Sequence, residues 1–177
     1  MRAAVVMMTK LPIPGFCKNR LMDVLEPKEC ADFQHLCISD LATTVQTSGL
    51  PLYIYYASPG EDERPENLGE EHNLRSLLSP QKGSDLGERM FNAVQDTLVN
   101  YEAVIVIGSD LPDLQPAVFQ EVIQKLEQAD LVLGPCPDGG YYLLAIKDNV
   151  PEIFEGIRWS SPQVLDQTMD KAKQAGL

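Results

Sequence analysis

The sequence predicts a three-layer α/β/α sandwich with a mainly parallel mixed sheet. Short apolar runs of strand length alternate along the chain with segments whose apolar residues recur at helical spacing. Such alternation is typical of parallel strands that are covered by helices on both faces. The 177 residues contain no internal repeat, low-complexity tract or Pro/Ser-rich linker, so a single domain over residues 1–177 is expected.

Five apolar runs are expected to be the strands. All of them are far too short to span a bilayer, which predicts that the chain has no membrane span. The first run is followed at once by Lys10 and two prolines, so it is interpreted as a strand and not as a signal peptide. The five runs are Ala3 to Met8, Leu52 to Ala57, Ala103 to Ile107, Leu131 to Leu133 and Tyr141 to Ile146.

Four helices are expected between and after these strands: Lys28 to Gln46, Asp85 to Val99, Pro116 to Ala129 and Ser160 to Ala175. Pro27 stands where the first helix can begin, and Ser161 is expected to cap the last one with Pro162 in its first turn. The charged stretch Ser58 to Asn73 is interpreted as a surface excursion or lid. Residues four apart predict the buried face of the first helix: Phe33, Cys37, Leu41 and Val45.

The charge distribution favours a small polyanion as the ligand. A net charge of −12 argues against nucleic acid and anionic membranes as partners. Residues 1–22 nevertheless carry four basic and no acidic side chains, a local charge of +4, so residues 23–177 carry −16.

The four cysteines and two histidines show no metal-ligand spacing, so zinc is not expected. Free thiols indicate a reducing compartment, which predicts a cytoplasmic protein.

A basic loop after the first strand is the candidate phosphate site. Lys18 and Arg20 close this loop with cationic donors suited to phosphate oxygens. An ordinary solvated loop is the alternative, and the chain contains neither a P-loop nor a dinucleotide fingerprint. The nucleotide-binding candidates here are Leu11, Pro12, Pro14, Gly15, Lys18 and Arg20.

Two aspartates follow strands and are the candidate metal ligands. Asp110 comes just after the third run, where Mg²⁺ or Mn²⁺ could bridge it to phosphates, and Ser109 precedes it. Asp138 could supply a second ligand, with Gly139 and Gly140 allowing a ligand to approach the backbone. The alternatives are a capping role for Asp110 and a tight turn at Asp138.

The start of the second helix holds a further candidate. Asp85 and Glu88 have the spacing of a capping box, which is the simpler explanation for that pair. Arg89 has no such structural role in sight and is predicted to bind an anion at the helix end. Trp159 is interpreted as a packing residue and not as a stacking platform.

Five motifs occur in one order: Lys10-x-Pro12-x-Pro14-Gly15-x-x-Lys18-x-Arg20-Leu21, Asp85-Leu86-Gly87-Glu88-Arg89-Met90, Gly108-Ser109-Asp110-x-Pro112, Gly134-Pro135-x-x-Asp138-Gly139-Gly140-Tyr141-Tyr142-Leu143 and Trp159-Ser160-Ser161. Together they resemble the bacterial glycosyltransferase-like group known as rSAM/selenodomain-associated transferases, which is similar to 2-phospholactate guanylyltransferase. The resemblance implies the GT-A, nucleotide-diphospho-sugar transferase fold. It also implies that relatives continue beyond Leu177 into further elements, so the last C-terminal elements are expected to be missing.

Residues and resemblance together predict a metal-dependent transferase that uses a nucleotide or nucleotide-sugar donor and a small-molecule acceptor. The resemblance implies that Lys18 and Arg20 face the nucleotide phosphates and that Asp110 and Asp138 hold the metal. Lys18, Arg20 and Asp110 are the predicted catalytic residues, because together they would neutralise charge on the leaving group. Glycosyl and nucleotidyl transfer both remain open, and a non-catalytic nucleotide-binding or regulatory module is the alternative function. A receiver-type signalling domain is disfavoured because Lys10 and Pro12 stand where that class needs acidic residues.

Overall fold

A computed structural model describes residues 1–60 and 78–177 of the chain. Its helices are α1 (Pro27–Thr47), α2 (Leu86–Leu98), α3 (Pro116–Leu126) and α4 (Val164–Gln174), with short 3₁₀ turns η1 (Asn19–Leu21) and η3 (Pro151–Ile153). Its strands are β1 (Ala3–Lys10), β2 (Leu52–Ala57), β3 (Leu78–Pro80), β4 (Ala103–Gly108), β5 (Leu131–Pro135) and β6 (Tyr141–Ile146). The predicted strands are all present, and β3 is an additional one that is too short to show a periodic pattern.

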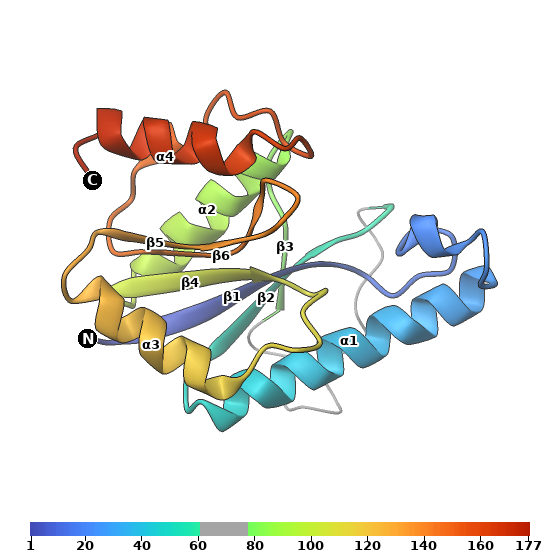
Figure 1. Cartoon of the computed structure of the whole chain (residues 1–177). Helices are drawn as coiled ribbons and strands as arrows, with labels where there is room; N and C mark the ends of the chain where they lie inside the picture. Colours follow the sequence, from blue (N-terminus) through green and yellow to red (C-terminus); the bar gives the residue numbers. More distant parts are fainter. Residues whose placement is uncertain (61–77) are drawn as a thin grey trace.

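The six strands form one mixed sheet in the order β3-β2-β1-β4-β6-β5. The pairs β1–β2, β1–β4 and β2–β3 are parallel, whereas β6 runs antiparallel to both β4 and β5. Helices α1 and α3 cover one face of the sheet, and α2 and α4 cover the other (Figure 1). The predicted three-layer sandwich with a mainly parallel sheet is therefore confirmed.

The central strands separate two hydrophobic cores. Successive side chains of a strand point to opposite faces of the sheet, so Val5 and Met7 of β1 belong to the core beneath α1 and α3, while Val6 and Met8 belong to the core beneath α2. All four of these residues are buried. Because both faces are covered, β1 and β4 are apolar without interruption, which is why they could be recognised in the sequence.

The buried face of α1 differs from the predicted one. Leu41 and Val45 are buried as expected, but Phe33 is 44% exposed and Cys37 is only partly buried. Positions four apart drift by about 40° per step around a helix of 3.6 residues per turn, so a row of them leaves the core within a few turns. The buried residues of α1 are Cys30, Ala31, Gln34, Ile38, Leu41, Ala42 and Val45.

The start of α4 was also predicted wrongly. The helix begins at Val164, and its N-cap position is Gln163. Ser161 does not cap the helix, because its hydroxyl donates to the Arg158 carbonyl at 2.6 Å. Ser160 has a positive φ of 62°, so the chain turns sharply here instead of entering a helix. The segment 159–162 is thereby left free to line the site described below.

Two further predictions concern the charged segment and the membrane. The segment predicted as a lid, Ser58 to Asn73, lies outside the described residues from residue 61 onward. In the part of the chain that the structure describes, no helix combines the length and apolar character needed to cross a bilayer.

Candidate functional site

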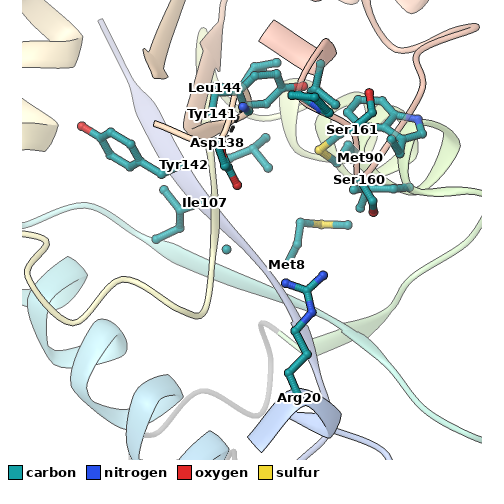
Figure 2. Close-up of a pocket in the computed structure, with 17 residues that line it drawn as sticks. Met8, Arg20, Met90, Ile107, Asp138, Tyr141, Tyr142, Leu144, Ser160 and Ser161 are labelled. Atoms are coloured by element: carbon teal, nitrogen blue, oxygen red, sulfur yellow. Dashed lines mark hydrogen bonds between the residues drawn. The ribbon is translucent and has the colours of Figure 1, made fainter. Parts of the chain in front are cut away.

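A pocket of about 530 Å³ opens at the edge of the sheet where the parallel strands β1 and β4 end. It is lined by the ends of β1 and β4, the start of β6, the first residues of α2 and the segment 159–164. Four of its 17 lining residues are charged or carry a hydroxyl on an aliphatic side chain: Arg20, Asp138, Ser160 and Ser161. Figure 2 shows the Arg20 guanidinium on one side of the pocket, beside Met8, with the other three across from it.

The loop after β1 is held by its own lysine. Lys10 Nζ donates to the Phe16 carbonyl at 3.3 Å and lies 5.1 Å from the centre of the Phe16 ring. The loop ends at Lys18, which adopts the left-handed conformation at φ 51° and directly precedes η1. This turn redirects the chain so that Lys18 and Arg20 both lie at the carboxyl edge of the sheet.

Lys18 and Asp110 form an ion pair across this edge. The Lys18 side chain is 11% exposed and its Nζ lies 5.2 Å from the centre of the Phe33 ring, whereas the Asp110 carboxylate is 68% exposed. Phe33 thus has a role at the surface of α1, since its ring supports the Lys18 ammonium. The pair places a cation and an accessible carboxylate next to one another.

Arg20 is available for a ligand. Within the described part of the chain its guanidinium has neither a hydrogen-bond nor an ion-pair partner, and it lines the pocket. A guanidinium presents a planar set of donors that suits phosphate oxygens. The geometry therefore offers an unpaired cation on the pocket wall that lies nearest to β1.

A buried polar network lies beneath Asp110. Gln34 Nε2 donates to Thr9 Oγ1 at 2.8 Å and to Ser109 Oγ at 3.0 Å. The Ser109 hydroxyl in turn lies 3.5 Å from Asp110 Oδ1. Because Gln34, Thr9 and Ser109 are all buried, this network joins α1, β1 and β4 just where Asp110 emerges from the sheet.

The sequence-based prediction missed this network, since Gln34 was not recognised as part of the buried face of α1. A polar residue within the stripe formed by Cys30, Ile38 and Leu41 was the available signal.

The hairpin between β5 and β6 positions Asp138. Asp138 Oδ1 accepts from the Gly140 N–H at 3.0 Å, and Gly139 takes a φ of 85°. This is the tight turn that was considered as the alternative role of Asp138. The carboxylate nevertheless lines the pocket, so its second oxygen remains available there. Asp138 is therefore both a turn residue and a pocket residue.

Two glycines hold the segment 159–162 against the rest of the site. A Cβ on Gly87 would lie 2.3 Å from the Phe154 carbonyl oxygen and 2.9 Å from Trp159 Nε1. A Cβ on Gly139 would lie 2.0 Å from the Pro162 carbonyl oxygen. Only glycine allows such close approach, so Trp159 packs directly on the first turn of α2. The prediction that Trp159 packs near the last helix is correct, but the ring is also a wall of the pocket.

The other predicted site residues are distributed as follows. Gly140 lines the pocket, while Pro12, Pro14 and Gly15 lie in the loop after β1 outside its lining. Leu11 is buried in the core, and both its N–H and its carbonyl are already hydrogen-bonded, to Ala57 and Ile13 respectively.

Arg89 does have a structural role, which the sequence did not indicate, while its binding of an anion stays a prediction. Its Nε donates to the Gly83 carbonyl at 3.1 Å and so holds the loop before α2. In the same region Asp85 caps α2 as predicted, with Oδ1 accepting from the Glu88 N–H at 2.9 Å. The Glu88 carboxylate binds the N–H and the hydroxyl of Ser84.

Asp110 and Asp138 are the two predicted metal ligands, and of these Asp138 lines the pocket while Asp110 lies outside its lining. Mg²⁺ is usually held by one or two carboxylates together with water and substrate phosphates. Both aspartates are exposed at the carboxyl edge. The described residues contain no group of three or more His, Cys, Asp or Glu side chains placed to hold a metal.

The thiols near the site are unsuited to nucleophilic catalysis. Burial raises the pKa of Cys17, and burial together with the nearby Asp138 charge raises the pKa of Cys136. Both thiols therefore stay protonated near neutral pH, whereas a nucleophilic cysteine needs a lowered pKa. Burial also raises the pKa of Tyr141 to about 12, which keeps this phenol of the pocket wall neutral.

Comparisons with known proteins agree with this geometry. A sequence profile for a family described as an uncharacterized protein conserved in bacteria (DUF2064) matches residues 40–161. Among curated proteins, 2-phospho-L-lactate guanylyltransferase of Methanobrevibacter smithii is 25% identical over 139 residues, which is 77% of this chain and 60% of that protein. The chain thus spans about 60% of the length of the curated relative it matches.

Solved structures show the same fold. A crystal structure from Desulfovibrio desulfuricans G20, provisionally described as a nucleotide-diphospho-sugar transferase, superposes with a TM-score of 0.87 at 31% identity, over 99% of this chain and 77% of that one. A cytidylyltransferase from Leptospira borgpetersenii superposes with a TM-score of 0.58 at 10% identity, over 98% and 73% of the two chains. The second likeness shows the fold alone. The predicted nucleotide-diphospho-sugar transferase fold is confirmed.

Proposed function

This chain belongs to the DUF2064 family, and from that premise we propose that it is a metal-dependent nucleotidyltransferase acting on a phosphorylated acceptor. The donor would be a nucleoside triphosphate. Guanosine triphosphate is the first one to test, because the relative from Methanobrevibacter smithii is named for guanylyl transfer. The phosphate on the acceptor follows the same name, which includes a phospho compound.

The observation that supports this proposal is that two cationic and two acidic side chains lie at the same edge of the sheet. Lys18 and Asp110 form an ion pair at the carboxyl edge outside the pocket lining, and Arg20 and Asp138 line the pocket. In open α/β sheets, ligands bind outside the carboxyl ends of the strands, at the point where the strand order reverses. That point lies here between β1 and β4, because the chain continues from β1 to β2 on one side and returns to β4 on the other.

Each residue then has a distinct task. Lys18 and Arg20 would bind phosphate oxygens of the donor and the acceptor and stabilise the negative charge that accumulates as pyrophosphate leaves. Asp110 and Asp138 would hold Mg²⁺ or Mn²⁺, which when bound supplies further positive charge to the phosphates. The network of Gln34, Thr9 and Ser109 would keep the Asp110 backbone in place.

The proposed reaction is a displacement at phosphorus. An oxygen of the acceptor phosphate attacks the α-phosphorus and forms a new P–O bond, while the bond from that phosphorus to the oxygen bridging to the β-phosphate breaks. Pyrophosphate leaves with the electron pair of that bond. An acceptor phosphate is already an anionic nucleophile near neutral pH, so no general base is required. This agrees with a pocket lining in which the described residues include no histidine.

Calorimetry with guanosine triphosphate tests the proposal. We expect binding that needs Mg²⁺ or Mn²⁺, with an affinity that falls at least ten-fold in Asp110→Ala. Asp113→Ala is the matched control, because Asp113 is also exposed and lies only three residues further along the same loop. Binding should be unchanged in that variant. Turnover with a phosphorylated acceptor should release pyrophosphate.

Other results would favour other functions. Glycosyl transfer is the second candidate, because the 31% identical structure is provisionally described as a nucleotide-diphospho-sugar transferase. Release of nucleoside diphosphate from a nucleotide-sugar would favour that reaction. Nucleotide binding that ignores both the metal and Asp110→Ala would instead favour a non-catalytic nucleotide-binding module.

A further inference from the structure

The pocket has a polar side near β1 and an apolar side beneath α2 and α4. Arg20 lies on the polar side, while Lys18 and Asp110 lie outside the pocket lining. The apolar side is built from large side chains on three different elements. These are Leu86 and Met90 of α2, Tyr141 and Leu144 of β6, and Trp159 and Val164 at the entrance to α4. The functional residues predicted from the sequence leave this apolar side unused.

The polar groups on this side are few, and several are already occupied. The Ser161 hydroxyl donates to the Arg158 carbonyl, and Asp138 Oδ1 accepts from Gly140. The hairpin backbone is also used, because the Gly139 N–H donates to the Cys136 carbonyl and the Gly139 carbonyl accepts from Leu165. Buried hydroxyl groups without partners are costly. The second oxygen of Asp138 and the Ser160 hydroxyl are the side-chain groups that remain, so a sugar with hydroxyls around its ring would leave most of them without a partner here.

The apolar side and β2 lie on opposite sides of the place where the nucleotide phosphates would bind. Lys18 and Arg20 are at the end of β1, and the apolar side lies over β4 and β6. A nucleotide bound at the reversal between β1 and β4 can extend its base toward β2, where the Gln81 side chain bridges the carbonyls of Thr9 and Tyr55 at 3.0 and 2.9 Å. The acceptor must approach the phosphates from the other side.

From this arrangement we propose that the acceptor is a phosphomonoester with an apolar or aromatic body. Its phosphate faces Arg20, and its body packs between Trp159, Leu86 and Met90. The strained segment at Ser160 and the close approach of Gly87 to Trp159 serve to hold this wall in place. The inference rests on the proposed function for the identity of the reaction, but the apolar subsite can be tested without turnover.

Trp159 makes the test direct, because it is the single tryptophan of the sequence. The full chain is titrated with phenyl phosphate and with glucose 1-phosphate while tryptophan emission is recorded. Both probes carry a phosphomonoester, so the comparison isolates the body of the molecule. We expect a saturable change in emission with phenyl phosphate and an affinity at least ten-fold higher than for glucose 1-phosphate.

Two variants at opposite ends of α2 test where the subsite lies. Leu86 is 42% exposed at the start of α2, and Val99 is 79% exposed at its end, so either can be replaced without loss of the core. Leu86→Asn should lower the affinity for phenyl phosphate about five-fold, and Val99→Asn should leave that affinity unchanged. Equal affinity for the two probes, or no effect of Leu86→Asn, would overturn the inference.

Two further measurements separate the possible failures. Guanosine, which has a base but no phosphate, should not displace phenyl phosphate, and displacement would mean that the apolar side takes the base. Metal-dependent binding of guanosine triphosphate should be the same in Val99→Asn and in the unaltered chain. If guanosine triphosphate fails to bind while phenyl phosphate binds as expected, the proposal of nucleotidyl transfer is wrong and the proposal of an apolar subsite is supported.

Discussion

The two walls of the site are held in place by different means. The wall beside β1 depends on buried polar side chains outside the pocket lining, since Gln34 joins Thr9 and Ser109 beneath Asp110. The wall beside α4 depends on close backbone contact at Gly87 and Gly139. A site can thus be held in position by hydrogen bonds, which tolerate a similar polar side chain, or by packing without space for a Cβ, which tolerates no side chain larger than that of glycine. The predictions below test that distinction.

The largest effect is expected for Gly139→Ala. The new Cβ would meet the Pro162 carbonyl oxygen at 2.0 Å, and the φ of 85° is unfavourable for alanine. We expect a loss of about 3 kcal/mol in the free energy of unfolding, measured by urea denaturation. Gly49→Ala is the control, because Gly49 has a φ of 79° but no atom within 4 Å of the new Cβ. It should lose about 1 kcal/mol, and equal losses would show that packing does not hold this wall.

Gln34→Leu tests the other wall. Leucine keeps much of the volume but removes the donor to Thr9 and Ser109, which leaves buried polar groups short of a partner. We expect a loss of about 2 kcal/mol. Gln120→Leu removes an exposed hydrogen bond to the Ser48 carbonyl and should change stability by less than about 0.5 kcal/mol. If both variants are equally stable, the network contributes nothing to this wall.

Tyr141 predicts a dependence of stability on alkaline pH. Its pKa is raised to about 12 by burial, against about 10 in an unfolded chain, so the unfolded state loses its proton first as pH rises. The stabilisation is complete below pH 10 and is lost between about pH 10 and 12, by up to about 2 kcal/mol. Tyr141→Phe should flatten this part of the stability curve. Parallel curves for the two proteins would contradict the buried position of the phenol.

The smallest effect on stability is expected for Lys18→Met. The Asp110 partner is 68% exposed, so solvent screens the ion pair and its loss should cost less than about 1 kcal/mol. Binding of guanosine triphosphate with Mg²⁺ should nevertheless fall at least ten-fold. A large loss of stability together with unchanged nucleotide binding would assign Lys18 to the scaffold and not to the site.

The sequence was informative where the physical signal is local. The strands β1 and β4 are continuous apolar runs because both faces are covered, and the position of Asp110 follows directly from the end of β4. The turn at Asp138 follows from the properties of Pro, Asp and Gly in sequence. These features depend on residues that are neighbours along the chain, so the order of residues is enough to predict them.

The residues that complete the site could not be predicted in this way. Gln34 donates a hydrogen bond to Ser109, which is 75 residues away in the sequence. Gly87 lies against Trp159, which is 72 residues away. Arg89 looked free only because its partner, the Gly83 carbonyl, belongs to the loop before its own helix. For Gln34 and Gly87 the partner is supplied by the way the chain folds back, which periodicity along the sequence does not record.

The alternation of strands and helices, the basic loop and the two aspartates at strand ends can all be predicted from the order of residues. That Arg20 and Asp138 share one pocket, and that this pocket has an apolar wall around Trp159, follows from the folded chain. The physical reason is that residue types set local conformation and burial. The distances between segments are set by how two helical layers pack on one sheet.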